Sequence, residues 1–345
     1  MKKILIFTQK INKNDPVLGF FHRWLLEFSK HFEYITVVCL EVGEYDLPKN
    51  IKVLSLGKES GISKIKYIFN FYKYILSEIG NYDSVFVHMN EEYVLLGGLV
   101  WGLFGKKVSM WRNHHAGSWK TRLAGILSDK VFCTSRYSFT ASFKNTKIMP
   151  VGIDTDFFKK DNNITKIPHS ILFLARISPV KKPHVLIEAL GILKKDGVPF
   201  VCSIYGNPLP KDFAYYQSLK DRVRELDLEA HIVFKEGVAN DDTVKIYNEH
   251  EVFINLSSSG MYDKTIFEAM ACGSVVIATN KNLIGVISDD YLVTEDDIIG
   301  LVSKLRHIFY LTLGEKDSAG VYLRDLVLRE HSLSMLAKIL SKELN

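Results

Sequence analysis

Short runs rich in β-branched and aromatic residues alternate with helical stretches along this 345-residue chain, and the alternation restarts once near its middle. The first series contains the extended runs ILIF, ITVVCL, SVFVHM, KVSMW and KVFCTS. After a polar stretch from Lys159 to His169, the second contains ILFLAR, FVCSIYG, HIVF, VFINLS and SVVIAT. This rhythm is typical of βαβ units, whose parallel strands are covered by helices on both faces. It favours two open α/β sheets over a single barrel.

We therefore predict two Rossmann-like, doubly wound parallel-sheet domains, residues 1–160 and 161–328, followed by a terminal helix within residues 329–345. Domains of about 100 to 200 residues are the norm, so two domains suit this length. Doubly wound sheets bind ligands at the carboxyl ends of their strands. Two such sheets facing a central cleft would place the chemistry between the domains.

Composition excludes several classes of protein. With 47% hydrophobic and 24% charged residues, the chain is neither disordered nor collagen-like. The longest uncharged apolar stretch, Tyr93 to Gly105, is shorter than the roughly 18 to 20 residues that span a bilayer. The start, MKKILIFTQK, reads as a buried strand rather than a signal peptide, which predicts a cytoplasmic protein. The cysteines lack the spacing of a zinc site or disulfide framework; they are Cys39, Cys133, Cys202 and Cys272.

The first chemical motif is ARISPVKKP, in which Arg176 ends an apolar run and Lys181 precedes a helix that begins near Pro183. Two cations beside a helix N-terminus suit a pyrophosphate, because free N–H groups and the helix dipole add to their charge. The alternative is a pair of solvated cations that flank a turn.

The second motif is SSSGMYDKTIFEAMACGSVVIAT, residues 257–279. The serines offer hydroxyl groups, and Gly260 allows a backbone to approach a ligand. Glu268, at the start of a small-residue helix, has a carboxylate that can accept two hydrogen bonds from a ribose diol. The alternative for Glu268 is a helix residue favoured only by the macrodipole.

These motifs resemble the GT-B glycosyltransferases of the family 4-like kind, the glycosyl transferases group 1. The resemblance covers nearly the whole chain. It rests on six segments in the expected order, which are PVLGFF, PVGIDTDFF, ARISPVKKP, IYGNP, FKEGV and FEAMACGSVVIAT.

The resemblance implies a retaining transfer from a nucleoside-diphosphate sugar to a glycan or lipid-linked saccharide, in the synthesis of a cell-surface polysaccharide or glycoconjugate. It implies that Arg176 and Lys181 hold the diphosphate, Glu268 the ribose, and that Gly19 lets the first loop approach the phosphates. It also implies an acceptor-binding first domain, a donor-binding second domain, and a terminal helix that crosses back to the first. No metal and no cofactor are expected, since no DxD-type carboxylate pair ends a strand.

One departure concerns the donor site. The family's paired glutamates stand eight positions apart, which would put the first at Gly260. Either Asp263 with Lys264 replaces that glutamate, or backbone groups of the Gly260 loop hold the donor; Thr265 completes this predicted donor-binding set. The departure keeps two alternatives open, a catalytically silent nucleotide-sugar or glycan-binding module and a nucleotide-sugar epimerase.

Histidines end two strands of the first half. The run KVSMWRNHH ends in His114 and His115, and similar family members use a histidine at such a strand end, so His114 is the predicted catalytic residue. His115, together with His88 in FVHMN and Trp111, is a weaker candidate for contacting the acceptor. A structural role, including core packing for Trp111, is the alternative for each.

Charge is unevenly distributed, with a net +9 in residues 1–150 and −4 in residues 151–345. The stretch Lys64 to Ile79 combines three lysines with five aromatic rings, which suits an anionic membrane surface and a lipid-linked acceptor. A helix packed on the sheet with solvated lysines is the alternative. No nucleic-acid module accompanies the positive charge, so nucleic acid is not an expected partner. The expected location is therefore cytoplasmic or peripheral on the inner face of the membrane.

Overall fold

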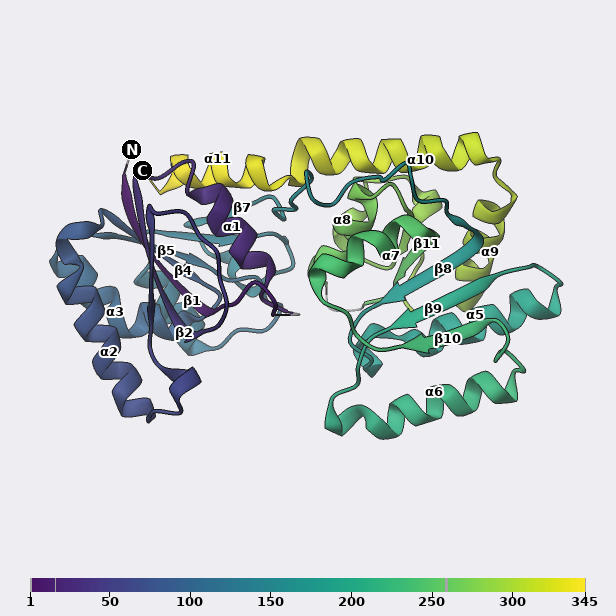
Figure 1. Ribbon diagram of the computed structural model, residues 1–345, viewed down its shortest axis with the longest axis horizontal. Coiled ribbons are helices and arrows are strands. Elements are labelled where there is room, and N and C mark those ends of the chain that lie inside the picture. The colour runs from purple at the N-terminus through teal and green to yellow at the C-terminus, as the bar shows by residue number, and fades with distance from the viewer. Residues whose placement is uncertain (1, 16, 258–259, 345) are drawn as a thin grey trace. The chain divides into compact units, whose positions relative to one another are not determined.

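The computed structural model describes residues 2–15, 17–257 and 260–344 (Figure 1). Its contacts divide the chain into two compact units, Met1–Gly152 with Leu333–Asn345, and Ile153–Ser332. The change of unit thus falls at Gly152, before the polar stretch in which the sequence analysis put the boundary. The last helix belongs to the first unit.

Within the described residues, the first unit has a seven-stranded parallel sheet in the order β3-β2-β1-β4-β5-β6-β7. Its strands are β1 (Lys3–Ile11), β2 (Tyr34–Val42), β3 (Ile51–Ser55), β4 (Ser84–His88), β5 (Lys107–Trp111), β6 (Lys130–Cys133) and β7 (Thr146–Ile148). All five predicted runs form strands. The sequence analysis missed β3 and β7, the two edge strands, whose residues are mostly half-buried or exposed and so lack a clear apolar run.

Helices cover both faces of this sheet because side chains alternate along each strand. Its helices are α1 (Phe20–Phe28), α2 (Lys64–Ser77), α3 (Glu91–Leu103), α4 (Trp119–Ile126) and α11 (Leu333–Glu343). Ile4 and Ile6 face a core with α1 and α11, whereas Leu5 and Phe7 face the opposite core with α2 and α3.

The terminal helix α11 packs against α1, as Figure 1 shows. Leu336 fills the space beside Gly152, where a Cβ would meet its side chain at 2.4 Å. Near the other end of α11, the Glu343 carboxylate forms ion pairs with Lys130 at 2.9 Å and Lys147 at 2.7 Å. Apolar and ionic contacts therefore fix both ends of this helix on the first unit.

The second unit has, among the described residues, a five-stranded parallel sheet in the order β10-β9-β8-β11-β12. The strands are β8 (Ile167–Leu174), β9 (Val201–Tyr205), β10 (Ile232–Lys235), β11 (His250–Asn255) and β12 (Val275–Ala278). Its helices are α5 (Pro183–Lys195), α6 (Phe213–Glu225), α7 (Thr243–Glu249), α8 (Lys264–Ala271), α9 (Ile298–Tyr310) and α10 (Leu313–Leu326). Every strand was predicted, while α9 and α10 extend the unit beyond the last predicted strand.

Candidate functional site

The strand order of the second unit creates a topological switch point between β8 and β11. β8 pairs with β9 on one side and with β11 on the other, so the chain leaves the sheet in opposite directions at this place. Ligands of doubly wound sheets bind at the carboxyl ends of the two strands that flank such a point. The loops that follow β8 and β11 carry four of the residues predicted for the donor, which are Arg176, Lys181, Gly260 and Asp263.

Lys181 and Asp263, on these two loops, form an ion pair. Lys181 Nζ lies 2.7 Å from Asp263 Oδ2 and 3.2 Å from Ser257 Oγ. Asn255, the last residue of β11, donates its side-chain N–H to the same Asp263 oxygen at 3.0 Å. The pair is about four-fifths buried, with side-chain exposures of 20% and 21%. The structure therefore joins two predicted donor residues that are 82 positions apart.

Local structure fixes where Lys181 lies. It ends a short 3-10 turn, Pro179–Lys181, and Lys182 then adopts a left-handed conformation with φ of 54° before Pro183 begins α5. Proline suits a first helical position because its missing N–H would have no partner there. Lys182 is held by ion pairs of 2.6 Å to Glu295 and Asp296. Of the two adjacent lysines, the first thus contacts Asp263 and the second does not.

Arg176 is exposed on the loop after β8 and has no ion-pair partner among the residues that the structure describes. The backbone around it is ordered by Ala175 N–H, which donates to Tyr205 at 3.1 Å, and by Ile177 N–H, which donates to Asn207 at 3.2 Å. Gly206 lies so close to the Ala175 carbonyl that a side chain would collide with it. The IYGNP motif therefore supports the loop that carries Arg176.

Glu268 is buried in α8, with 4% exposure. Tyr247 donates its hydroxyl to Glu268 Oε2 at 3.0 Å, and Asn240 donates its side-chain N–H to Oε1 at 3.2 Å. Burial, and then the Glu268 carboxylate, raise the pKa of Tyr247 well above its ordinary value, so this phenol remains a donor. Neither Tyr247 nor Asn240 was predicted to belong to the site, because neither lies in the motif that contains Glu268.

Lys264 and Thr265 form the first turn of α8, whose N-cap is Asp263. The helix therefore begins at Lys264, four residues before Glu268, where the sequence had predicted its start. Desolvation lowers the pKa of Lys264, and the Glu268 carboxylate, one helical turn away, opposes that shift. The predicted cation thus lies between the N-terminus of a helix and a buried carboxylate.

Gly260 has a left-handed backbone with φ of 69°. Its carbonyl accepts a hydrogen bond from the Asn282 side chain at 2.7 Å. A glutamate at this position would be strained, because side chains with a Cβ disfavour this region. The backbone conformation therefore gives a physical reason for the departure from the paired glutamates. Ser258 and Ser259 of the same motif lie outside the described residues.

In the first unit, Gly19 precedes α1 at the end of the loop after β1. A Cβ at Gly19 would lie 2.6 Å from the Asp15 carbonyl oxygen and 2.8 Å from that of Lys13. The absence of a side chain thus lets the loop close on itself, whatever else it contacts. Pro16 of the PVLGFF motif lies outside the described residues.

His114 and His115 are exposed after the end of β5, and their rings stack with centroids 4.6 Å apart. His114 Nδ1 accepts a hydrogen bond from the Ala116 N–H at 3.0 Å. Beside them, Arg112 forms an ion pair of 2.5 Å with Glu91 of α3. The loop is therefore tied to its neighbours while both imidazole rings stay accessible, as the predicted role of His114 requires.

His88 and Trp111 are core residues. His88 is 2% exposed, stacks on Phe21 at 4.2 Å, and has Nδ1 3.2 Å from Thr8 Oγ1. Trp111 is 5% exposed and packs edge-on against Trp24 at 5.1 Å. Their burial favours the structural role that the sequence had left open for both residues over contact with an acceptor.

The four cysteines, Cys39, Cys133, Cys202 and Cys272, are free and buried. Burial raises the pKa of Cys39 and of Cys272 to about 12, so neither thiol ionises near neutral pH. Across the described ranges, no three His, Cys, Asp or Glu side chains are placed to share a metal ion. Within residues 2–15, 17–257 and 260–344 no helix has the length and hydropathy of a membrane span.

Two doubly wound parallel sheets, the second with a charged cluster at its switch point, define a protein of the GT-B fold. The solved structure of Anabaena Alr3699/HepE in complex with UDP has the same fold, with a TM-score of 0.78 at 16% identity, covering 100% of this chain and 99% of that one. Residues 154–306 match the family model described as glycosyl transferases group 1. The match to this model confirms the resemblance found in the sequence over these residues.

Curated relatives match over shorter segments. A D-inositol 3-phosphate glycosyltransferase of Rhodococcus erythropolis is 29% identical over 118 residues, which cover 34% of this chain and 27% of that protein. An alpha-monoglucosyldiacylglycerol synthase of Streptococcus pneumoniae is 26% identical over 206 residues, which cover 54% of this chain and 42% of that protein. The chain thus spans about a quarter to two-fifths of the length of these relatives.

Proposed function

We propose that this protein transfers a sugar, with retention of configuration, from a nucleoside-diphosphate sugar to a saccharide or lipid-linked acceptor, without a metal ion. The observation that carries the proposal is the contact between Lys181 and Asp263 at the switch point of the second sheet. A cation in that position can bind the donor diphosphate and stabilise the charge that develops on it as the glycosidic bond breaks.

The diphosphate would lie over the loop that follows β8 and the N-terminus of α8. Arg176 is exposed there, so its guanidinium is available for a bidentate contact with phosphate. Lys181 would exchange Asp263 for a phosphate oxygen, which leaves Asp263 to accept a hydrogen bond from a donor-sugar hydroxyl. The exchange would let Asp263 take the place of the glutamate missing at Gly260.

Glu268 would hold the ribose. Tyr247 and Asn240 occupy one acceptor site on each carboxylate oxygen and fix its orientation, and each oxygen has further lone pairs. His114, exposed and held by Ala116, would contact the donor sugar or the reacting centre from the first unit. Uridine is the first base to test, since HepE was crystallised with UDP.

A donor panel tests the proposal. We expect UDP, GDP or ADP, or one of their sugars, to raise the melting temperature, because a ligand that binds only the native state stabilises it. Arg176→Ala should weaken the binding of that ligand by about 10- to 100-fold, because a hydrogen bond to a charged group is lost. Arg224→Ala, on exposed α6, is the matched control.

Turnover separates the two alternatives. A glycosyltransferase forms product only when an acceptor is added, whereas an epimerase converts the nucleotide sugar alone. A protein that binds the donor, yet shows no turnover with a panel of saccharide and lipid acceptors, would support the silent binding module, for which the neutralised Lys181 is the structural argument.

A further inference from the structure

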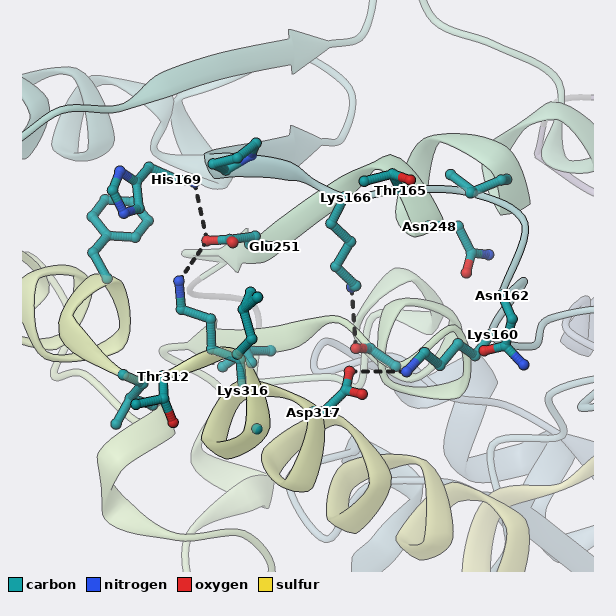
Figure 2. A pocket seen from close by; sticks show the side chains of 18 of the residues that line it. Lys160, Asn162, Thr165, Lys166, His169, Asn248, Glu251, Thr312, Lys316 and Asp317 are labelled. Atoms are coloured by element: carbon teal, nitrogen blue, oxygen red, sulfur yellow. Dashed lines mark hydrogen bonds and ion pairs between the residues drawn. The ribbon is translucent and has the colours of Figure 1, made fainter.

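A cavity lies at the amino ends of the strands of the same sheet, whereas the candidate donor site lies at their carboxyl ends. The cavity has a volume of about 800 Å³ and is lined by residues at the amino ends of β8, β11 and β12 and at the start of α10 (Figure 2). β11 has six residues, which at about 3.3 Å each separate its two ends by roughly 17 Å. The cavity is therefore distinct from the candidate donor site and independent of the function proposed for it.

Two of its three lysines are neutralised. Lys160 forms an ion pair of 2.8 Å with Asp317, and Lys316 forms one of 2.9 Å with Glu251. The Glu251 carboxylate also accepts the backbone N–H of His169 at 3.1 Å. These groups mutually satisfy their charges, so they frame the cavity without requiring a ligand.

Lys166 differs from the other two lysines. Its Nζ donates to the backbone carbonyls of His250 at 3.0 Å and Gly273 at 3.2 Å, and among the described residues it forms no ion pair. An ammonium has three N–H donors, so one is left for the cavity that Lys166 lines (Figure 2). Burial lowers its pKa to about 8. The ionisable groups that face it are Lys160, Glu251, Cys272 and Asp317.

Six of the residues that line the cavity have apolar side chains. They are Ile164, Pro168, Val275, Phe309, Leu311 and Leu313. Cavities of about 300–1,000 Å³ with an apolar lining and a few polar groups are typical small-molecule sites. Lys166, the only lysine of this cavity without a carboxylate partner among the described residues, thus lines the same cavity as these apolar side chains.

We propose that this cavity binds a small amphiphilic monocarboxylate, with its carboxylate on Lys166 and its apolar body against Phe309, Leu311 and Leu313. One uncommitted ammonium matches one negative charge. A phosphate monoester fits less well, because its second charge would face the carboxylates of Asp161, Glu251 and Asp317, which also line the cavity.

Calorimetric titration of the full chain with octanoate, octyl phosphate and 1-octanol tests the proposal. We expect octanoate to bind at least tenfold more tightly than either of the others. Tighter binding of octyl phosphate would overturn the choice of a carboxylate, and equal binding of 1-octanol would overturn the role of charge. Absence of octanoate binding at millimolar concentration would refute the site.

Lys166→Gln should weaken octanoate binding at least tenfold, because it removes the charge. It should leave the affinity for 1-octanol within threefold, because glutamine keeps an N–H donor. The matched control is Lys160→Gln in the same cavity, which should leave octanoate within threefold. An equal loss in both variants would contradict the assignment to Lys166.

Proton uptake provides a measurement on the unmodified protein, should Lys166→Gln fail to fold. At pH 8.5 free Lys166 is partly deprotonated, and a bound carboxylate favours its ammonium form, so octanoate binding should take up protons. Titration in buffers of different ionisation enthalpy measures this uptake, which should be near zero at pH 6.5. Equal uptake at both pH values would refute Lys166 as the counter-charge.

Discussion

The ammonium of Lys181 lies 2.7 Å from the carboxylate of Asp263, across the switch point between β8 and β11. Both groups are mostly buried, so this ion pair is stronger than one in open solvent. A nucleoside diphosphate that uses Lys181 must therefore compete with Asp263. In the proposed donor site, the negative charge of Asp263 beside this ammonium would oppose a phosphate, so the phosphate would exchange with Asp263 on Lys181.

Substitutions at this pair should act in opposite directions on nucleotide binding. Lys181→Met should weaken UDP binding by about 10- to 100-fold, since it removes a charge-assisted hydrogen bond. Asp263→Asn should strengthen UDP binding by about 2- to 10-fold, because the carboxylate no longer competes with phosphate for the Lys181 ammonium. The same substitution should lower the rate of sugar transfer. Calorimetry and a transfer assay measure both effects. Weaker UDP binding by Asp263→Asn would contradict the exchange.

Glu268→Gln should abolish recognition of the ribose while sparing the diphosphate. We expect UDP to bind at least tenfold more weakly and pyrophosphate, which lacks a ribose, to bind within twofold of the original protein. Tyr247→Phe is the structural control; it removes one hydrogen bond to Glu268, at a cost of about 1 kcal/mol in stability, and should keep UDP within a few-fold. A loss of pyrophosphate binding in Glu268→Gln would point to general misfolding of the site.

Restoring a glutamate at position 260 should harm the protein. Gly260→Glu must adopt a left-handed backbone, which costs about 1–2 kcal/mol, so we expect a lower free energy of unfolding and no gain in transfer. Gly314→Ala, within α10 and with open space around its Cβ, should instead gain about 0.5–1 kcal/mol. Urea denaturation measures both. Higher turnover of Gly260→Glu without loss of stability would disprove this explanation.

Stability should fall in mild acid because of His331. Burial lowers its pKa to about 4, against about 6.5 in an unfolded chain. The unfolded state therefore binds the proton more readily, so the contribution is complete above pH 6.5 and is lost as pH falls towards 4. The difference amounts to about 3 kcal/mol.

Denaturation at pH 7 and pH 4.5 measures that loss. His331→Phe, whose ring can pack on Phe267 as the imidazole does at 4.5 Å, should reduce the fall in stability between the two pH values. The exposed-histidine control His115→Gln should leave it unchanged. An identical pH profile in His331→Phe would show that other groups cause the acid loss.

The basic aromatic helix α2 should associate with anionic lipid. Ile65 and Phe69 are 79% and 68% exposed, whereas Phe71 and Ile75 face the core, so the structure combines both readings of the sequence. A lysine near an anionic surface contributes about 1 kcal/mol. Neutralising all three lysines of α2 to glutamine should therefore reduce partitioning by about 100-fold.

Liposome flotation measures this partitioning. The variant changes Lys64, Lys66 and Lys73. A control variant neutralises three exposed lysines of the second unit, Lys211, Lys245 and Lys281. Equal recovery of both variants with anionic vesicles would remove the membrane surface from the proposal.

Features that depend on residues close together in the chain could be predicted from the sequence, whereas contacts between distant residues could not. The alternation of apolar runs predicted all five strands of the second sheet, because burial on both faces leaves a local pattern in composition. ARISPVKKP likewise indicated that Arg176 and Lys181 lie near a helix start. Edge strands such as β7 left no such pattern, since only part of each is buried.

The contacts between side chains of different elements could not be predicted from these local patterns. No motif indicated that Tyr247 would orient Glu268, and for Trp111 the sequence left both ligand contact and core packing open, whereas the residue packs in the core. Periodicity reports which face of an element is apolar, but not which residue of another element meets it.

Patterns among residues near one another in the chain were enough to predict the parallel α/β architecture, all strands of the second sheet and two cations beside a helix start. The tertiary structure alone decided that Lys181 meets Asp263 and that Lys166 faces a cavity without a carboxylate partner among the described residues. Those contacts join loops and strand ends 80 or more positions apart. They form only when the strands align in register, since no local propensity can specify which distant charge will be the neighbour.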